Sequence, residues 1–291
     1  MKLPKHFLDF FVFSNIYVAF PVACLGWETF LLIDENPDWN LLLFIYSSTL
    51  FLYVFHRFRG SLNVTGENLT QRIIWAKNHN KTLRIVLIAS ALFSFYAFLG
   101  LNCRQMLLLL PMVFIAGGYT LPLIKKGNER QRFRDIPRLK IFLITVVVSF
   151  ITVWLPILSD SGFDEFFSKD AMLLLAERAL FIFAITVPFD IRDMDFDRKF
   201  NLKTIPLLLG EKGAVRLSII FILCFLALCF VHNYYGNLME SGFLSAMTLS
   251  AIFTIIVLSF TKRQRSEYFF SLLVEGTMLV QFLLVLFADL L

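Results

Sequence analysis

Nine apolar runs, each close to the length needed to cross a lipid bilayer, constrain the fold of this chain more than any other feature. They cover residues 7–33, 40–56, 82–101, 103–124, 139–159, 170–189, 213–232, 241–261 and 267–289. Hydrophobic residues make up 58% of the sequence, against roughly 45–50% in soluble domains. The sequence therefore predicts an all-α, multi-pass membrane protein with nine transmembrane helices, folded as a single domain over residues 1–291.

The basic residues predict how these helices are oriented. With the N-terminus in the cytoplasm, 24 of the 27 Lys and Arg residues fall on inner segments, whereas the outer loops are acidic. This positive-inside pattern predicts an external C-terminus and an integral protein of the bacterial inner membrane, with its active-site loops in the cytoplasm. Because the charges are spread over all the inner loops, nucleic acid is not an expected partner.

Three aspartates, Asp190, Asp193 and Asp197, follow the sixth apolar run. On a helix, positions i, i+3 and i+7 fall within about 60° of one another. Mg²⁺ takes oxygen ligands, usually from carboxylates, phosphates and water. The pattern therefore predicts a Mg²⁺-bound phosphate or diphosphate at the lipid boundary. The alternative is a solvated acidic helix end, but the interleaved cations Arg192 and Arg198 favour a metal with a diphosphate.

A second candidate group closes the fourth apolar run, at Tyr119, Lys125 and Lys126 after the pair Gly117 and Gly118. Glycines allow close approach of helices in a membrane. Tyr119 offers a ring and a hydroxyl to a cation or an aromatic substrate, and the lysines can hold phosphate as point charges. The alternative is a packed helix end whose two lysines reach for the membrane surface.

A third candidate group closes the second run at His56 and Arg57, on the same inner face as the aspartates. We interpret His56 as a base or hydrogen-bond donor and Arg57 as a diphosphate ligand. The alternative for His56 is a solvated or capping residue. Lys203, beyond the aspartates, supplies a further cation.

Three ionisable residues, Glu177, Arg178 and Glu275, fall inside predicted membrane helices. Charged groups at that depth are costly and usually face a partner or a cavity. Glu177 and Arg178 are adjacent, so they point in different directions and need partners on other helices. The sequence leaves open whether they are structural or line a path for transport.

The chain resembles the UbiA-type intramembrane prenyltransferases over nearly its whole length. Three segments carry the resemblance: Asp190-x-x-Asp193-x-x-x-Asp197 with Lys203-Thr204-x-Pro206, Tyr119-Thr120-x-Pro122 with Lys125, and Arg134-Asp135-Ile136-Pro137-x-x-Lys140. The resemblance implies a nine-helix bundle, Mg²⁺, an isoprenyl diphosphate substrate and an aromatic or other lipid-soluble acceptor.

One segment departs from that family. Its first Asp-rich motif should close the second helix, but the run from Tyr53 to Asn63 holds no aspartate, and none occurs between Asp38 and Asp135. We therefore expect one Mg²⁺ site instead of two, with His56 and Arg57 in place of the missing one.

The leading hypothesis is a divergent, Mg²⁺-dependent prenyltransferase. Its expected site residues are Tyr119, Lys125 and His56 in catalysis, Arg57, Lys125, Lys126 and Lys203 on the diphosphate, and Asp190, Asp193 and Asp197 on the metal. The main alternative is a UbiA-like protein that binds a lipid or quinone without catalysis. A CDP-alcohol phosphotransferase is disfavoured because its longer aspartate pattern is absent, and a transporter does not account for the three aspartates.

Overall fold

The computed structural model is built almost entirely from helices and describes residues 5–63, 71–120, 124–126, 129–131, 133, 136, 139–160, 163–199 and 202–291. Seven helical spans in it are long and apolar enough to cross a membrane. They are α3 (Trp39–Asn63), α5 (Asn80–Leu99), α7 (Leu139–Asp160), α9 (Lys169–Lys199), α10 (Ile205–Tyr235), α11 (Ser241–Ser259), and η2 (Phe269–Val274) joined to α12 (Gly276–Asp289). The predicted all-α, multi-pass architecture is confirmed.

The first and fourth apolar runs form less regular spans. α1 (Lys5–Phe13) and α2 (Ile16–Leu32) make an eighth span only when counted together, because they are bent by 55° at a short break. α6 (Cys103–Thr120) is apolar but shorter than the others. The nine predicted spans are thus slightly more than the described helices support by length and composition.

Two helices extend beyond their apolar runs. α9 continues past the end of its run at residue 189 to Lys199, so the three aspartates lie on a helix, as their spacing predicted. α10 begins at Ile205, ahead of the predicted start at residue 213, and is kinked at Gly210, whose φ of 73° favours glycine. In both cases a helix extends past its apolar run into polar sequence, where hydrophobicity alone does not mark its end.

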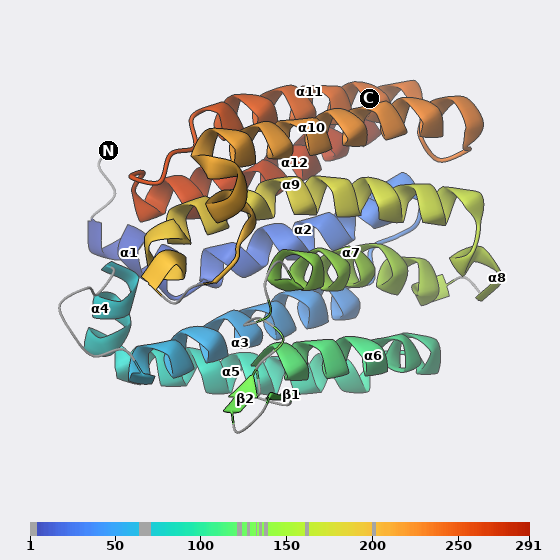
Figure 1. Ribbon diagram of the computed structural model, residues 1–291. Coiled ribbons are helices and arrows are strands. Elements are labelled where there is room, and N and C mark those ends of the chain that lie inside the picture. Colours follow the sequence, from blue (N-terminus) through green and yellow to red (C-terminus); the bar gives the residue numbers. More distant parts are fainter. Residues whose placement is uncertain are drawn as a thin grey trace.

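Three short elements of the described chain lie outside the long helices, two of them helices at opposite ends of the bundle and the third a hairpin beside α6 (Figure 1). α4 (Gln71–Asn78) lies beside the last turns of α3 (Figure 1). β1 (Ile124–Lys126) and β2 (Glu129–Gln131) form a small antiparallel hairpin with Ile124 opposite Gln131. α8 (Phe163–Phe166) lies at the opposite end of the bundle, between α7 and α9.

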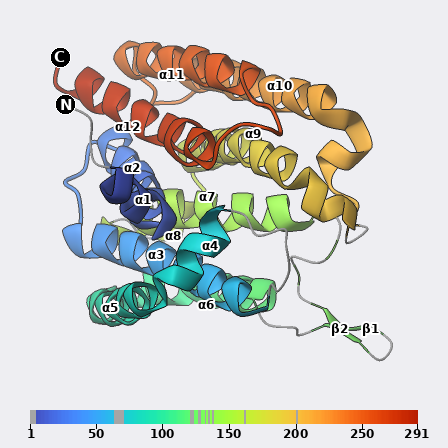
Figure 2. The same cartoon turned by 90° about the vertical axis from the view of Figure 1, so that its left-hand side faces the viewer.

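The long helices pack in three layers. α2, α7 and α9 lie between α10–α12 on one side and α3, α5 and α6 on the other (Figures 1 and 2). The middle layer buries its apolar side chains on both faces, and Leu25, Leu155 and Phe181 are fully buried there. This central layer brings the aspartates of α9 close to the start of α7.

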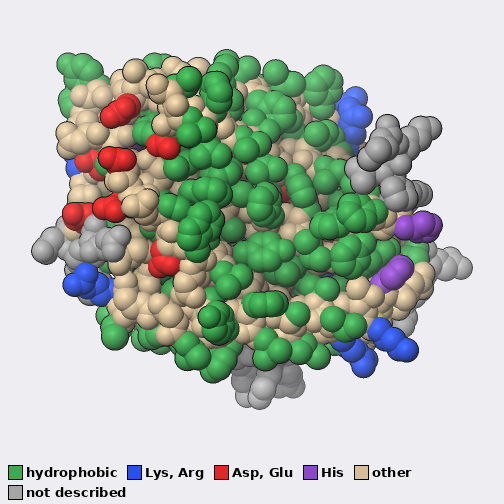
Figure 3. Space-filling model, turned by 180° about the vertical axis from the view of Figure 1, so that it is seen from behind, with side chains coloured by type: hydrophobic (Ala, Val, Ile, Leu, Met, Phe, Trp, Pro, Cys, Tyr) green, Lys and Arg blue, Asp and Glu red, His purple; other side chains and the backbone are tan. Residues whose placement is uncertain are grey.

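The surface carries the pattern expected of a membrane protein. An apolar band covers the middle of the molecule, acidic side chains gather at one end, and most of the visible basic and histidine side chains lie at the other (Figure 3). Large apolar residues such as Ile85, Phe95 and Phe114 are mostly exposed, as lipid-facing side chains should be. We call the end with α4 and the last turns of α9 the basic end, and the end with Asp34 and Glu35 the acidic end.

Glu177 and Arg178 find the partners on other helices that the sequence required. His232 of α10 lies with Nδ1 2.9 Å from Glu177 Oε1. Arg178 Nη2 lies 3.0 Å from Oε1 of Glu28 on α2, which also accepts a 2.9 Å hydrogen bond from Gln281 Nε2 on α12. These pairs join four helices across the middle and acidic half of the bundle, so they stabilise its packing.

Replacing Gln281 with leucine tests this network. We expect the free energy of unfolding to fall by about 1–2 kcal/mol, because the Glu28 carboxylate loses a buried hydrogen bond. Thermal unfolding in detergent measures the change, with Ser250→Ala as the control, since Ser250 makes only a 3.4 Å contact to the same amide. An unchanged melting temperature would contradict a stabilising role.

Cysteine labelling tests the predicted topology, in which 24 of the 27 basic residues lie inside. That topology places Asn36 and Asn128 on opposite faces of the membrane, and Asn128 lies outside the described residues. Asn36 and Lys262 are both exposed, at opposite ends of the bundle. In a background lacking the exposed Cys103 and Cys224, an impermeant maleimide should label N36C from outside and K262C from inside. Labelling of both from one side would disprove the topology.

Candidate active site

A polar cavity of about 180 Å³ opens among the helices at the basic end. Four cations line it from four different helices: Arg57 on α3, Arg72 on α4, Lys140 on α7 and Arg192 on α9. Glu275, just after η2, is the single carboxylate among the described residues that line it. The lining therefore carries more positive than negative charge and favours an anionic ligand, although carboxylates just outside the lining contact three of the four cations.

An apolar cavity of about 130 Å³ adjoins the polar one. It lies among α3, α6 and α7, and the two cavities share Tyr53, Tyr119, Ile144 and Val148 as a common wall. His56 lines this second cavity, and its ring centre lies 5.1 Å from that of Tyr119 at a steep angle. A ligand with a charged head and a hydrocarbon tail could thus place one part in each cavity.

Two of the three aspartates converge on Lys140. Its Nζ lies 2.8 Å from Asp190 Oδ1 and 3.8 Å from Asp193 Oδ2. Asp190 is buried, and the helical spacing of three residues puts both carboxylates on the face of α9 that meets α7. Asp197 follows one turn later; it is also buried, and its Oδ2 has no hydrogen-bond partner in the described part of the chain.

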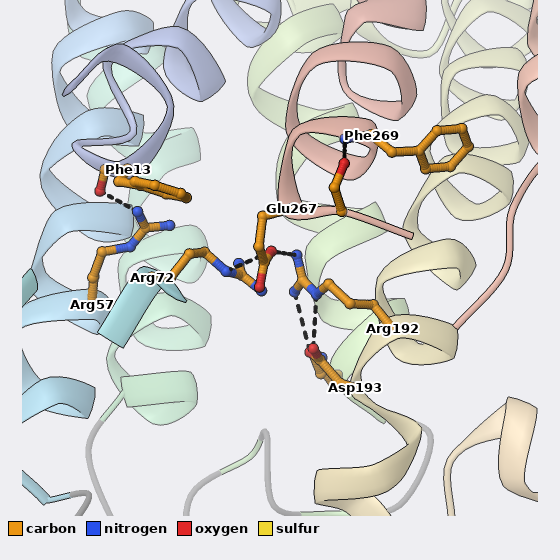
Figure 4. A network of polar contacts seen from close by, with 9 residues as sticks. Phe13, Arg57, Arg72, Arg192, Asp193, Glu267 and Phe269 are labelled. Atoms are coloured by element: carbon orange, nitrogen blue, oxygen red, sulfur yellow. Dashed lines mark hydrogen bonds and ion pairs between the residues drawn. The ribbon is translucent and has the colours of Figure 1, made fainter. Parts of the chain in front are cut away.

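Arg192 is the most heavily contacted cation of the cavity. Its Nε lies 2.8 Å from Asp193 Oδ1, and its Nη1 lies 3.5 Å from Glu267 Oε2 (Figure 4). Its guanidinium also lies 5.1 Å from the ring centre of Phe189 and 5.5 Å from that of Phe270. Such contacts hold a guanidinium in a fixed orientation, so it is pre-organised for a ligand.

Glu267 contacts two of the four cavity cations, Arg72 and Arg192. Its Oε2 lies 2.9 Å from Arg72 Nε and also contacts Arg192, so one carboxylate oxygen links α4 to α9 (Figure 4). Burial and the nearby charge of Arg192 lower the pKa of Arg72, whereas Glu267 and Asp193 oppose that shift. Glu267 therefore stabilises two like charges close together.

Arg57 lines the cavity from α3. Its Nη1 donates a hydrogen bond to the carbonyl of Phe13, at the end of α1 (Figure 4). The guanidinium is thus anchored at the break between α1 and α2 while it lines the cavity. Arg57 and Tyr119 thus line the same cavity, whereas Asp190, Asp193 and Asp197 are not among the described residues that line it.

The other expected site residues are distributed unevenly. Tyr119 lines both cavities, but His56 lines only the apolar one. Lys203 is exposed and lines neither cavity. The side chains of Lys125 and Lys126 lie outside the described part of the chain. Their roles, and those of the three aspartates, stay predictions.

The fit of these residues to Mg²⁺ depends on how their oxygen atoms are grouped. In the ranges that the structure describes, no three His, Cys, Asp or Glu side chains are grouped to hold a metal ion. Even so, Asp190 and Asp193 already converge on one positive charge, and the unpartnered Oδ2 of buried Asp197 lies on the same helix. This donor set is of the hard oxygen type that Mg²⁺ takes together with phosphate and water.

Comparison with known proteins gives a consistent result. The sequence pattern of the UbiA prenyltransferase family matches residues 72–279, whereas no curated protein matches. Among solved structures, a UbiA homologue from Archaeoglobus fulgidus bound to GPP and Mg²⁺ aligns with a TM-score of 0.65 at 13% identity, covering 97% of this chain and 99% of that one. The apo UbiA homologue from Aeropyrum pernix K1 aligns at 0.63 and 18%, covering 95% and 98%.

Proposed function

Because this chain belongs to the UbiA prenyltransferase family, we propose that it transfers an isoprenyl group from a prenyl diphosphate to an aromatic or other lipid-soluble acceptor within the membrane. The observation that carries the proposal is the pair of adjoining cavities, one lined by four cations and the other almost wholly apolar. A prenyl diphosphate has the same division between an anionic head and a hydrocarbon tail. Structural relatives from Archaeoglobus fulgidus were solved with GPP or DMAPP and Mg²⁺.

The four cations would serve the departure of diphosphate. Negative charge grows on the diphosphate as its bond to the allylic carbon breaks, so fixed positive groups lower the barrier more than they strengthen ground-state binding. Arg57 can offer parallel N–H donors to phosphate oxygens, and Lys140 adds a point charge. Arg192 already bonds Asp193 and Glu267, so it would contribute its charge and its remaining N–H groups. Tyr119, in the wall between the cavities, would lie beside the allylic cation and stabilise it with its ring.

The proposed metal site consists of the three aspartates. Asp190, Asp193 and Asp197 would hold one Mg²⁺, which when bound supplies further positive charge to the diphosphate oxygens. Lys140 would then turn from the carboxylates towards the phosphate. The sequence around Arg57 holds no aspartate for a second ion, so that guanidinium would carry the corresponding charge.

The identity of the membrane and the side that the polar cavity faces are also part of the proposal. The apolar band and the separation of acidic and basic ends support a multi-pass protein (Figure 3). We place it in a bacterial inner membrane with the polar cavity towards the cytoplasm, because the basic residues gather at that end. Membrane lipid would contact the apolar band directly.

The direct test is incubation of the purified protein with radiolabelled geranyl diphosphate and a panel of acceptors, with and without Mg²⁺. We expect prenylated product that depends on the divalent ion. The absence of aspartate from the segment around Arg57 favours one rival, a non-catalytic lipid- or quinone-binding protein. That rival predicts binding of the prenyl compound without release of diphosphate.

A further inference from the structure

Two buried polar side chains in the polar cavity lack partners within the described residues. Both amide atoms of Asn15 and the Oε2 atom of Glu275 make no hydrogen bond there. Asn15 is 1% exposed and Glu275 is 8% exposed, and both line the cavity. Buried polar groups are normally hydrogen-bonded, so two such groups facing one cavity indicate a ligand that completes them.

Both residues lie at irregular points of the backbone. Asn15 has a left-handed φ of 66° at the break between α1 and α2. Glu275 directly follows the π-helical turn η2, where its N–H bonds to the carbonyl of Phe270, five residues earlier. Left-handed non-glycine residues and π-helical turns occur preferentially at functional sites. Each irregularity changes the direction of a side chain that a regular helix would have placed elsewhere.

The two irregularities adjoin one another. Tyr17, two residues after Asn15, donates a 3.3 Å hydrogen bond to the carbonyl of Leu272, three residues before Glu275. α2 and α12 also pack along their length. This part of the cavity wall is therefore a fixed unit formed by the first and last spans.

The charged and polar groups of the cavity come from different elements. The four cations come from α3, α4, α7 and α9, and Arg57 contacts the carbonyl of Phe13. Asn15 lies two residues later, at the break between α1 and α2, and Glu275 follows η2. Glu275 makes no ion pair within 4.0 Å among the described residues, although Arg57, Arg72 and Arg192 all act on it electrostatically. A carboxylate that stays apart from four available cations is poorly suited to hold diphosphate but well suited to receive a proton.

We propose that Asn15 and Glu275 form the acceptor subsite, in which Glu275 is the catalytic base for an acceptor with a protonated nucleophile, such as a phenol or an alcohol. This inference rests on the proposed prenyl transfer. The acceptor atom gives an electron pair to the allylic carbon, and the bond from that carbon to oxygen breaks with its pair leaving on diphosphate. The proton of the acceptor atom passes to the Glu275 carboxylate, while the Asn15 amide orients the acceptor. Glu275 releases the proton to water after the product leaves.

The test uses the full chain in lipid nanodiscs with geranyl diphosphate and, as acceptors, 1-naphthol, hexadecanol and water, the last detected as geraniol. Glu275→Gln should lower kcat about a hundredfold, the lower range for loss of a general base. Its affinity for inorganic diphosphate should not fall, because the four cations are untouched and a nearby negative charge is removed. Glu275→Asp should restore part of the rate. Asp289→Asn, an exposed carboxylate change on the same helix, should have no effect.

Asn15→Gly separates orientation from proton transfer. Glycine keeps the left-handed backbone and removes only the amide, so the fold should be retained. We expect KM for the organic acceptor to rise about tenfold, the equivalent of one lost hydrogen bond, with diphosphate affinity unchanged.

The possible failures are distinguishable. If the unmodified protein binds no diphosphate or never consumes geranyl diphosphate, the proposed function is wrong. If it turns over and Glu275→Gln does so at the same rate, only the acceptor subsite is wrong. Loss of diphosphate affinity in Glu275→Gln, in a protein with an unchanged melting temperature, would likewise overturn the subsite and assign Glu275 to the diphosphate.

Discussion

Replacing Arg57 with lysine is expected to lower prenyl-transfer turnover about a hundredfold, although the charge is conserved. A guanidinium offers parallel donors to two phosphate oxygens, whereas an ammonium offers a single point charge. Losing one charge-assisted contact to a developing leaving group costs on the order of 3 kcal/mol in the transition state. The anchor to the Phe13 carbonyl adds to the effect, because it fixes the direction of the Arg57 guanidinium.

Steady-state rates with geranyl diphosphate measure this effect, and Arg59→Lys is the matched control. Arg59 lies two residues further along α3 and does not line either cavity. Thermal unfolding of both variants shows whether the contact to Phe13 serves mainly to hold α1. If R57K turns over normally but melts earlier, Arg57 is structural, and the compensation for the missing aspartate motif must be sought in Arg72 or Arg192.

The fold was predictable because each membrane-spanning helix corresponds to an apolar run of sequence long enough to cross the bilayer. The number of spans was harder to predict, because a local break in the backbone divides one of them. The break at Asn15 bends the first span by 55°, yet the surrounding sequence stays apolar on both sides. A single residue with a left-handed backbone leaves no trace in hydrophobicity.

The site was only partly predictable. The positions of Arg57 and Tyr119 follow from their place at the inner ends of helices, since all such ends meet at one face of the bundle. Arg72 and Glu267 were missed because they lie in a short helix and at the first turn of the last helical span, and their contact depends on tertiary packing. The many charged residues between the apolar runs indicated that ion pairs would form there. The sequence does not show which of these residues, far apart in the chain, contact one another.

The contacts of Lys140 were also not predictable from the sequence. The resemblance placed it in a family segment without assigning it a role. Its contact with Asp190 across 50 positions of sequence depends on α7 and α9 lying side by side in the central layer. Glu275 was recognised as a costly buried charge, but its direction depends on a π-helical turn that no sequence period reveals.

The strongest test of the metal proposal is to replace Asp190 or Asp193 with asparagine, which keeps the size of the side chain and removes its charge. In the presence of Mg²⁺, we expect the affinity for a non-hydrolysable geranyl diphosphate analogue to fall about a hundredfold, or ~2.7 kcal/mol, because the ion loses a charged ligand. In EDTA the affinity should stay the same or rise. In the unsubstituted protein Lys140 Nζ lies 2.8 Å from Asp190 and 3.8 Å from Asp193, and removing either negative charge frees Lys140 for the diphosphate.

This opposite response to the metal distinguishes two roles for the aspartates. If Asp190 and Asp193 only position Lys140, each substitution should weaken binding equally with and without Mg²⁺. Asp195→Asn is the matched control, because Asp195 lies on the same helix, is 65% exposed and pairs with Arg263. Calorimetric titration of all three variants gives the affinities, and thermal unfolding confirms that the bundle is intact. Equal losses under both conditions would leave the four cations as the sole diphosphate ligands, and the aspartates as their supports.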